Sequence, residues 1–370
     1  MVIRVGIIGL SAKATGTGWA ASAHLPYLQK SPHYKIVALC NSSRGNAEAA
    51  IKAFGLSADT KAYGSPEELA DDANVDLVVV NTRVDTHDTL LLPSLRKAKA
   101  AFCEWPLAAN EARAKEMLEA AEKSGSRTMA GLQARASPVI QKIKKIIDDG
   151  TIGKVLSSTL YGYTHNGGAE ESESVSYMTQ REVGGNILTI HFGHTIDYLL
   201  YTLGEIETVQ SLLATQFPEV KLVDSWATRK VVGVAKKNTP DQILLQAKLK
   251  TGALLSVHIQ GGYPPPFDPK ALWRIAGEKG DIEIAADSIL LNVRTEGFPI
   301  RLHIRETGVV EDIAIEKNEL DNLPMPARNI GRVYEAFAAD DKSNSIASFQ
   351  DAFRIHVLIE SMLNNWDEGI

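Results

Sequence analysis

The sequence predicts two domains of different fold class: an α/β domain built on a doubly wound parallel sheet, then an α+β domain with a large, open, mostly antiparallel sheet. Apolar strands alternate with amphipathic helices over residues 1–135, which is typical of a parallel sheet. Beyond that point, strand-like segments joined by short turns accumulate, as in antiparallel sheets. We therefore expect domains at residues 1–135 and 136–370, with a last helix near 349–366 that is able to pack back on the first domain.

Composition narrows the class of protein. The 370-residue chain is 44% hydrophobic, enough to fill two cores, and its net charge of −6 argues against a nucleic-acid surface. No apolar run reaches the ~20 residues of a membrane span, and the chain starts directly with a strand, which leaves no room for a signal peptide. Cys40 and Cys103 are expected to be buried, reduced thiols. We expect a cytoplasmic protein that binds no nucleic acid, membrane or metal.

The first strand and the turn after it predict a dinucleotide site. An apolar run over residues 3–8 ends at Gly9, and a helical pattern begins at Trp19. Glycine at such a turn lets the backbone approach a pyrophosphate, and the helix N-terminus supplies N–H groups. The usual pattern is G-x-G-x-x-G, whereas here Ser11 stands at the second glycine and the turn from Ala12 to Gly18 is longer.

The end of the second strand, residues 35–40, bears on the choice of cofactor. It is followed by Asn41, Ser42, Ser43 and Arg44. NAD-preferring sites carry an acidic residue here, which this chain lacks, while hydroxyls and a guanidinium suit a 2′-phosphate. The alternative is that Ser43 or Asn41 caps the helix at 46–54 and that Arg44 is a solvated charge. Beside the opening stretch, we favour NADP(H), with NAD as the alternative cofactor.

Three further strands complete the predicted parallel sheet, at residues 76–82, 101–104 and 127–132. Ligands bind at the carboxyl ends of such strands, so Thr82 and Arg83, which emerge there, are candidates. His87 stands at the start of the helix that follows, and the last two strands end at Glu104 and at Gln133 and Arg135. His87 also suits a helix cap or a core histidine. Helices are predicted at 110–123 and 137–149, and a short helix follows Ser65 as its cap, with Pro66 first.

The second domain is predicted to be mostly strands. They lie at residues 155–163, 208–216, 226–234, 243–250, 253–261, 271–277 and 282–285. A helix at 186–203 carries His191, His194 and Asp197, and another helix is expected near 330–339. The acidic stretch 167–185 is expected to be a solvated loop, with a lid as the alternative. An open sheet of this kind usually covers its bare face with a second copy, so we expect a homodimer.

Several short motifs resemble the Gfo/Idh/MocA oxidoreductase family over essentially the whole chain. They are the opening strand and helix, Glu104-Trp105-Pro106, Gln133-x-Arg135-x-x-Pro138 and Gly193-His194-Thr195-Ile196-Asp197. The chain is most similar to the branch that holds the fungal galactose-regulon repressor, because of Gly-Trp-Ala in the first helix, Glu-Trp, Phe192-Gly193-His194 and Pro240-Asp241. The resemblance implies a Rossmann domain, a small-molecule substrate between the domains, and a nicotinamide dinucleotide held by Gly9, Ser11, Trp19, Ser42, Arg44, Thr82, His87, Glu104, Trp105 and Arg135.

The chain also departs from what the family implies. Trp105 stands where family dehydrogenases have a lysine that contacts the reacting group, and Ile190 replaces an assisting aspartate. His194 is retained, with His191 one turn earlier on the same helical face. General acid–base help is worth ~10²–10⁴ in rate, so losing two groups should cripple ordinary sugar-alcohol oxidation. Trp105 would wall the pocket with an aromatic plate that favours apolar or conjugated ligands.

Three functions follow from these residues. The first is an NADP(H)-dependent oxidoreductase acting on a small, conjugated carbonyl or imine, with His194 as proton donor, helped by His191, Tyr163 or Tyr161. The second is a non-catalytic, dinucleotide-binding regulator, cytoplasmic or nuclear, that presents its cleft to a partner protein. The third is a redox-neutral enzyme on the same fold. The alternative role for His194 is structural, as a helix histidine bonded to a neighbouring carbonyl.

Overall fold

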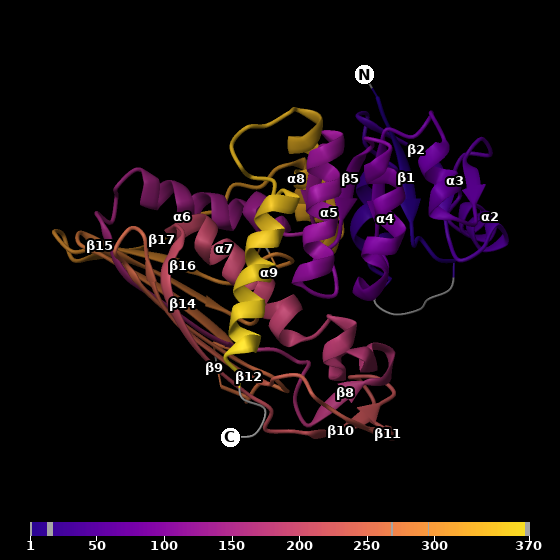
Figure 1. Ribbon diagram of the computed structural model, residues 1–370. Helices are drawn as coiled ribbons and strands as arrows, with labels where there is room; N and C mark the ends of the chain where they lie inside the picture. The colour runs from indigo at the N-terminus through magenta and orange to yellow at the C-terminus, as the bar shows by residue number, and fades with distance from the viewer. Residues whose placement is uncertain (1, 13–17, 268, 295, 367–370) are drawn as a thin grey trace. The chain divides into compact units, whose positions relative to one another are not determined.

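The computed structural model describes residues 2–12, 18–267, 269–294 and 296–366 (Figure 1). The chain divides into two compact units, each assembled from separate segments. The first unit contains Met1–Gln133, Glu182–Gly185 and Asn318–Val357. The second unit contains Ala134–Arg181, Asn186–Lys317 and Leu358–Ile370. Most of the turn predicted after Gly9, residues 13–17, lies outside the described residues.

The first unit is built on a six-stranded parallel sheet of order β3-β2-β1-β4-β5-β6. This order, reversing between β1 and β4, is that of the dinucleotide-binding α/β fold and confirms the predicted fold class. The strands are β1 Ile3–Ile8, β2 Tyr34–Cys40, β3 Lys61–Tyr63, β4 Leu77–Val80, β5 Ala100–Cys103 and β6 Thr128–Ala130. All four residues of β4 are buried, as a central parallel strand with both faces covered requires.

Helices cover this sheet, and Figure 1 shows α4 and α5 side by side. They are η1 Ala20–His24, α1 Leu25–Leu28, α2 Arg44–Ala53, α3 Pro66–Asp71, η2 Val84–Thr86, α4 His87–Arg96, α5 Glu111–Ser124, η7 Glu319–Asn322 and α8 Met325–Ala338. Ser65 caps α3 as predicted, its hydroxyl accepting from the backbone N–H of Glu68. The Ser43 hydroxyl accepts from the backbone N–H of Asn46, which is the helix-cap alternative considered for the residues after β2. The last helix, α9 Phe349–Asn364, contributes its first nine residues to this unit.

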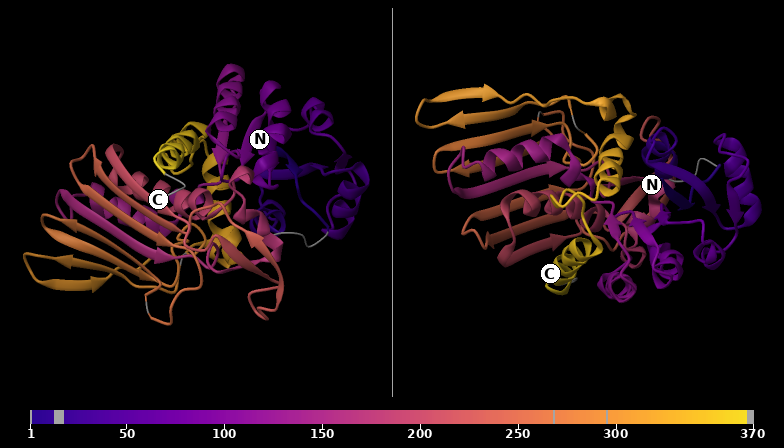
Figure 2. Two further views of the ribbon diagram at one scale, coloured as in Figure 1. Left: turned by 60° about the horizontal axis from the view of Figure 1, so that its bottom comes forward. Right: turned by 90° about the horizontal axis from the view of Figure 1, so that it is seen from above.

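The second unit is built on an eight-stranded sheet of order β17-β16-β15-β14-β7-β13-β12-β9, in which only β7 and β13 are paired in parallel among the described strands. Its strands are β7 Val155–Tyr163, β9 Ile206–Ala214, β12 Gln242–Leu249, β13 Leu254–Gln260, β14 Ala271–Gly277, β15 Gly280–Ala286, β16 Ile300–Ile304 and β17 Val309–Asp312. Figure 2 shows these strands side by side, with α6 (Pro138–Asp148) and α7 (Gly193–Leu203) on one face. The predicted open, mostly antiparallel sheet is confirmed.

The two faces of this sheet differ in what covers them. On the helix face, Trp273 of β14 packs against Tyr198 of α7 with ring centroids 5.4 Å apart, and its Nε1 donates to Ser158 of β7. Alternation along β7 places Tyr161 and Tyr163 on the opposite face. That face also carries exposed apolar side chains, among them Leu212, which is 72% exposed.

Two expectations for residues 136–370 are wrong. The acidic stretch 167–185 is not a solvated loop: it forms β8 (Glu170–Ser172), η4 (Glu173–Thr179) and η5 (Arg181–Val183). Glu171 of β8 is 2% exposed and accepts hydrogen bonds from Gly167, Asn166 and Ser172, so the acidic composition concealed a buried, satisfied carboxylate. The strand expected at 226–234 begins at residue 231 instead, as β11 (Val231–Lys236), which pairs with β10 (Glu219–Val223).

Two smaller features bear on the class of protein. Among the residues that the structure describes, no helix combines the length and the apolar character needed to cross a bilayer. Cys40 and Cys103 are buried and unbridged, and burial raises the pKa of both thiols, that of Cys40 to about 11.

Candidate functional site

The carboxyl ends of β1 and β4 lie where the strand order of the first unit reverses, which is where open α/β sheets bind ligands. Gly9 follows β1 there with a φ of +98°, a backbone conformation that favours glycine. A Cβ at this residue would lie 2.6 Å from the carbonyl oxygen of Asn81 and 2.7 Å from Cγ2 of Thr82. Only glycine allows the turn after β1 to pass this close to β4.

The side-chain amide that follows β4 is buried without a partner. Neither Nδ2 nor Oδ1 of Asn81 has a hydrogen-bond partner among the described residues. Nε1 of Trp19, elsewhere in the same unit, has none in the described part of the chain either. Buried polar atoms nearly always have partners, so an orphaned amide at the ligand-binding edge of the sheet suits a site that a ligand completes. The phosphates, ribose hydroxyls and carboxamide of a nicotinamide dinucleotide complement such donors and acceptors. The residues present therefore fit that cofactor. Ser11 lies exposed just beyond Gly9.

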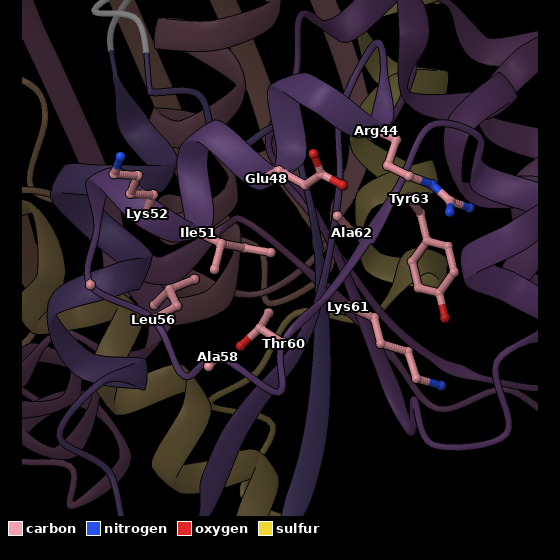
Figure 3. Close-up of a pocket in the computed structure, with 11 residues that line it drawn as sticks. Arg44, Glu48, Ile51, Lys52, Leu56, Ala58, Thr60, Lys61, Ala62 and Tyr63 are labelled. Carbon is pink, nitrogen blue, oxygen red and sulfur yellow. The ribbon is translucent and has the colours of Figure 1, made fainter.

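The residues after β2 form the start of α2 and leave the Arg44 guanidinium mostly free. The Ser42 hydroxyl accepts from Nδ2 of Asn46 at 2.9 Å, while the Ser43 hydroxyl is occupied by the helix cap. The Arg44 side chain is 61% exposed, and its Nη2 lies 3.6 Å from Oε1 of Glu68, a loose surface ion pair. Figure 3 shows Arg44 beside Tyr63 in a groove of about 630 Å³ between α2 and β3.

Thr82 and His87 connect the end of β4 to the loop after β5. The His87 ring is buried, with Nδ1 2.9 Å from the carbonyl oxygen of Pro106 and Nε2 3.0 Å from that of Thr82. Burial lowers the pKa of His87. The Thr82 hydroxyl accepts from the hydroxyl of Thr86 at 2.8 Å. Both ring nitrogens of His87 thus face carbonyl oxygens of the chain itself, which corresponds to the structural alternative considered for this residue.

Glu104, after β5, belongs to a buried chain of hydrogen bonds. Its Oε1 lies 2.7 Å from Nε2 of His24, whose Nδ1 lies 2.8 Å from the hydroxyl of Tyr334 on α8. A Cβ at Gly131 would lie 2.5 Å from Oε2 of Glu104, so that glycine makes room for the carboxylate. The hydrogen bonds hold Glu104 in one orientation.

Trp105 packs against a histidine from α9. The Trp105 ring is 5% exposed and lies 4.8 Å from the ring of His356, measured between centroids. His356 is itself 3% exposed, and its Nε2 has no hydrogen-bond partner in the described part of the chain. Burial, with a smaller contribution from His87, lowers the pKa of His356 to about 3, so the ring is neutral at physiological pH.

In the second unit, Arg135 is tied to Asp197 of α7. Nη2 of Arg135 lies 2.6 Å from Oδ1 of Asp197, and Nε lies 3.1 Å from both carboxylate oxygens. Both side chains are buried, so this is a charge-assisted, bidentate pair rather than a surface contact. It joins two motifs that were noted separately in the sequence, Gln133-x-Arg135 and the His194-to-Asp197 segment.

His191 and His194 lie three residues apart where η6 (Ile187–Phe192) runs into α7. Asn186 caps η6, accepting from the backbone N–H groups of Leu188 and Thr189. Each histidine is 7% exposed, and Nδ1 of each has no hydrogen-bond partner among the residues described. Burial lowers the pKa of His191 to about 4 and that of His194 to about 3, so both rings are neutral at pH 7.

Tyr163 is not brought together with these histidines. It lies on the face of the sheet opposite α7, where its hydroxyl hydrogen-bonds that of Tyr161. Burial and this hydrogen bond raise the pKa of Tyr161 to about 12. His258 of the neighbouring strand β13 packs on Tyr161 with ring centroids 5.5 Å apart. The two tyrosines thus belong to the bare face of the sheet.

Comparison with known proteins assigns the chain to a family. Residues 3–132 match the model of the GFO_IDH_MocA oxidoreductase family, with an NAD-binding Rossmann fold, and residues 138–286 match that of the Gal80p C-terminal domain. The galactose/lactose metabolism regulatory protein GAL80 of Saccharomyces cerevisiae is 32% identical over 300 residues, which cover 77% of this chain and 67% of GAL80. The chain belongs to the Gfo/Idh/MocA family.

Two further proteins are similar to nearly the whole chain. Dehydrogenase aclE of Aspergillus oryzae is 28% identical over 368 residues, covering 99% of this chain and 97% of aclE. The crystal structure of a super-repressor mutant of Gal80p from Saccharomyces cerevisiae superimposes with a TM-score of 0.87 at 25% identity, covering 98% of this chain and 96% of that one. The resemblance inferred from the motifs is therefore confirmed, and an NAD-binding Rossmann domain is established.

Three residues of this Gfo/Idh/MocA member were not found from the sequence. Asn81 stands between an apolar strand and Thr82, where it resembles an ordinary loop residue. His24 and His356 lie on amphipathic helices, and nothing in their spacing indicates burial beside Glu104 or Trp105. Among the described residues, no three His, Cys, Asp or Glu side chains gather as a metal site would need.

Proposed function

We propose that this protein is a nicotinamide-dinucleotide-dependent oxidoreductase that acts on a small carbonyl or imine compound and its reduced form. The observation that carries the proposal is the reversal of strand order between β1 and β4, where Gly9 adopts its left-handed conformation and the side-chain amide of Asn81 is unpaired among the described residues. The near full-length match to a dehydrogenase supports redox chemistry rather than binding alone. When bound, the dinucleotide supplies or accepts the hydride.

NADP(H) is the proposed cofactor, with NAD(H) as the alternative. No acidic residue follows β2, and the mostly exposed Arg44 guanidinium is held only by a 3.6 Å contact with Glu68. A surface ion pair this weak contributes little free energy, so Arg44 can leave Glu68 and make a bidentate contact to a 2′-phosphate instead. The Ser42 hydroxyl accepts one hydrogen bond from Asn46 and retains its own O–H as a donor.

His194 is the proposed proton-transfer group, with His191 beside it. A pKa of about 3 makes the imidazole neutral at pH 7, and a ring with this pKa is a weak base. The unpaired Nδ1 of His194 would therefore hold the reacting hydroxyl, amine or carbonyl by a hydrogen bond and exchange a proton with it only while that group reacts. Tyr163, on the far face of the sheet, is left out of the proposed mechanism.

A non-catalytic regulator remains the second candidate function, because of the 32% identity to the regulatory protein GAL80. Trp105 and Ile190, where the family resemblance leads us to expect a lysine and an aspartate, favour it too. In that case the dinucleotide would be held without turnover and a partner protein would bind. A redox-neutral enzyme on the same fold is the third. A nuclear location would accompany the regulatory role, and a cytoplasmic one the enzymatic role.

A homodimer formed through the bare face of the large sheet is also part of the proposal. Register pairs Leu212 with Leu244, Leu244 with His258, His258 with Tyr161, and Tyr161 with Leu272, so one apolar and aromatic row crosses five strands. Leu212 is 72% exposed and Leu254, on the same face, 61%. An exposed apolar face of this kind is typical of an interface. Residues 1–135 would then serve the cofactor, and 136–370 the substrate and the dimer.

One experiment separates the candidates. The purified protein is titrated with NADPH and NADH, and absorbance at 340 nm is followed with a panel of carbonyls, imines and their reduced forms. Turnover that is lost in His194→Ala supports the oxidoreductase. Tight dinucleotide binding with no turnover on any substrate, together with specific recovery of a protein partner, would support the regulator instead.

A further inference from the structure

The buried amide of Asn81 carries an inference that rests on the proposed dinucleotide function. We infer that Asn81 is a cofactor-binding residue for the nicotinamide half of the dinucleotide, kept unsatisfied in the free protein. The family resemblance did not assign it a role, and the sequence gives no signal for it.

The position of Asn81 is fixed by backbone contacts on two sides. Its N–H donates to the carbonyl oxygen of Ile8 at 3.0 Å, which extends the pairing of β4 with β1 by one residue. Its own carbonyl oxygen is the atom that a Cβ at Gly9 would approach to 2.6 Å. Asn81 therefore lies directly against the turn that the dinucleotide requires, on an element too well paired to move away.

The side chain of Asn81 has nothing to bond in the free protein. Both Nδ2 and Oδ1 are inaccessible to water and have no hydrogen-bond partner among the described residues. An amide placed in this state lowers the stability of the fold, because its lost bonds to water are not replaced. A dinucleotide bound at the carboxyl end of β4 would supply the missing partners once it displaces the Asn81 side chain from this inaccessible position.

The side of the crevice decides which half of the cofactor Asn81 meets. In a sheet of this order, the two ends of a dinucleotide lie on either side of the reversal point. Arg44 follows β2 on one side, the side proposed for the adenosine and its 2′-phosphate. Asn81 follows β4 on the other side, so the part of the cofactor that it would meet is the nicotinamide mononucleotide half. The ribose hydroxyls and the carboxamide of that half can each donate a hydrogen bond to an amide and accept one from it.

The test compares whole dinucleotides with their adenosine fragments. Wild type, Asn81→Ala and Asn74→Ala are titrated by calorimetry with NADPH and NADH and with 2′,5′-ADP and AMP, and the melting temperature of each free protein is measured. Asn74 is the matched control: its exposed amide, just before β4 at the opposite end of the strand, accepts from Nη1 of Arg4 at 3.2 Å. We expect Asn81→Ala to weaken the dinucleotide about tenfold or more and to leave the fragment unchanged.

The free Asn81→Ala protein should also melt a few degrees higher than wild type, because it loses an unsatisfied buried amide. Asn74→Ala should change neither affinity. Equal dinucleotide affinity in wild type and Asn81→Ala would overturn the inference and leave the proposed function standing. Equal weakening of dinucleotide and fragment, or a lower melting temperature, would also overturn it. A wild type that binds no dinucleotide would remove the proposed function and the inference together.

Discussion

Lowering the pH from 7 to 5 should destabilise this protein strongly, because at least three buried histidines are neutral in the folded state. The folded pKa is about 4 for His191 and about 3 for His194 and His356, all below the ordinary value of 6.5. Below pH 6.5 the unfolded chain takes up protons that the folded chain excludes. Stability is therefore complete above pH 6.5 and falls as the pH drops toward the folded pKa values.

The size of this effect follows from proton linkage. A histidine that titrates at 6.5 when unfolded and near 3 to 4 when folded lowers the free energy of unfolding by about 2 kcal/mol between pH 7 and pH 5. The three histidines together lower it by about 6 kcal/mol, which is comparable with the whole stability of many domains. His191 and His194 belong to the second unit and His356 to the first. If the units unfold separately, the second unit therefore loses about 4 kcal/mol and the first about 2 kcal/mol.

Urea unfolding at pH 7 and pH 5, followed by circular dichroism, measures this loss directly. His356→Phe keeps an aromatic ring against Trp105 and should reduce the pH-dependent loss by about 2 kcal/mol, whatever its stability at pH 7. His33→Gln, at a half-exposed histidine, is the control and should change the loss little. A stability that is equal at pH 7 and pH 5, or a loss that His356→Phe leaves intact, would refute the reasoning.

Three further predictions concern the proposed function. Arg44→Ala should weaken NADPH about tenfold or more and NADH little, since only the 2′-phosphate loses its partner; equal losses in a binding titration would remove the assignment. His194→Ala should lower turnover at least ~100-fold, and the wild-type rate should show no step near pH 6.5, because its pKa lies near 3. Leu212→Glu should shift the protein from dimer to monomer in sedimentation experiments, since the side chain is 72% exposed on the bare face. An unchanged sedimentation coefficient would argue against that interface.

The sequence predicts the first unit well because its signals are local. Continuous apolar runs mark β1, β2 and β4, and capping serines mark the starts of α2 and α3, so each element could be placed within a few residues. The three-residue strand β3 (Lys61–Tyr63) was missed, because its pattern is too short to distinguish from a turn. Fold class therefore depended on the long elements, and it was right.

The second unit is harder because its short strands depend on distant partners. β8 pairs with β10 some fifty residues away, and no local alternation of apolar and polar residues predicts a strand at β8. Glu171 in β8 looked like part of an acidic loop, yet it is buried among donors from Gly167 and Ser172. Composition predicts exposure for carboxylates on average, and only tertiary partners reverse that expectation.

The candidate site also contains residues with a local sequence signal and residues without one. Gly9 could be predicted because a glycine that ends the first strand is itself the signal for the turn, and Arg44 because it is a charged residue directly after a strand. The pairing of Arg135 with Asp197, sixty-two residues apart, and the packing of His356 on Trp105 could not be predicted, since each depends on how separate elements meet. The depressed pKa values of the histidines likewise follow from burial, which a lone histidine in a sequence does not reveal.

The central claim is that this protein binds a nicotinamide dinucleotide and uses it for redox chemistry with His194. The most direct measurement is the rate of absorbance change at 340 nm, with NADP or NADPH and paired oxidised and reduced substrates, in wild type and His194→Ala. We expect turnover in wild type and at least ~100-fold less in the variant, while both bind the dinucleotide equally. Turnover unaffected by His194→Ala would contradict the assigned residue, and dinucleotide binding without any turnover would contradict the claim of catalysis.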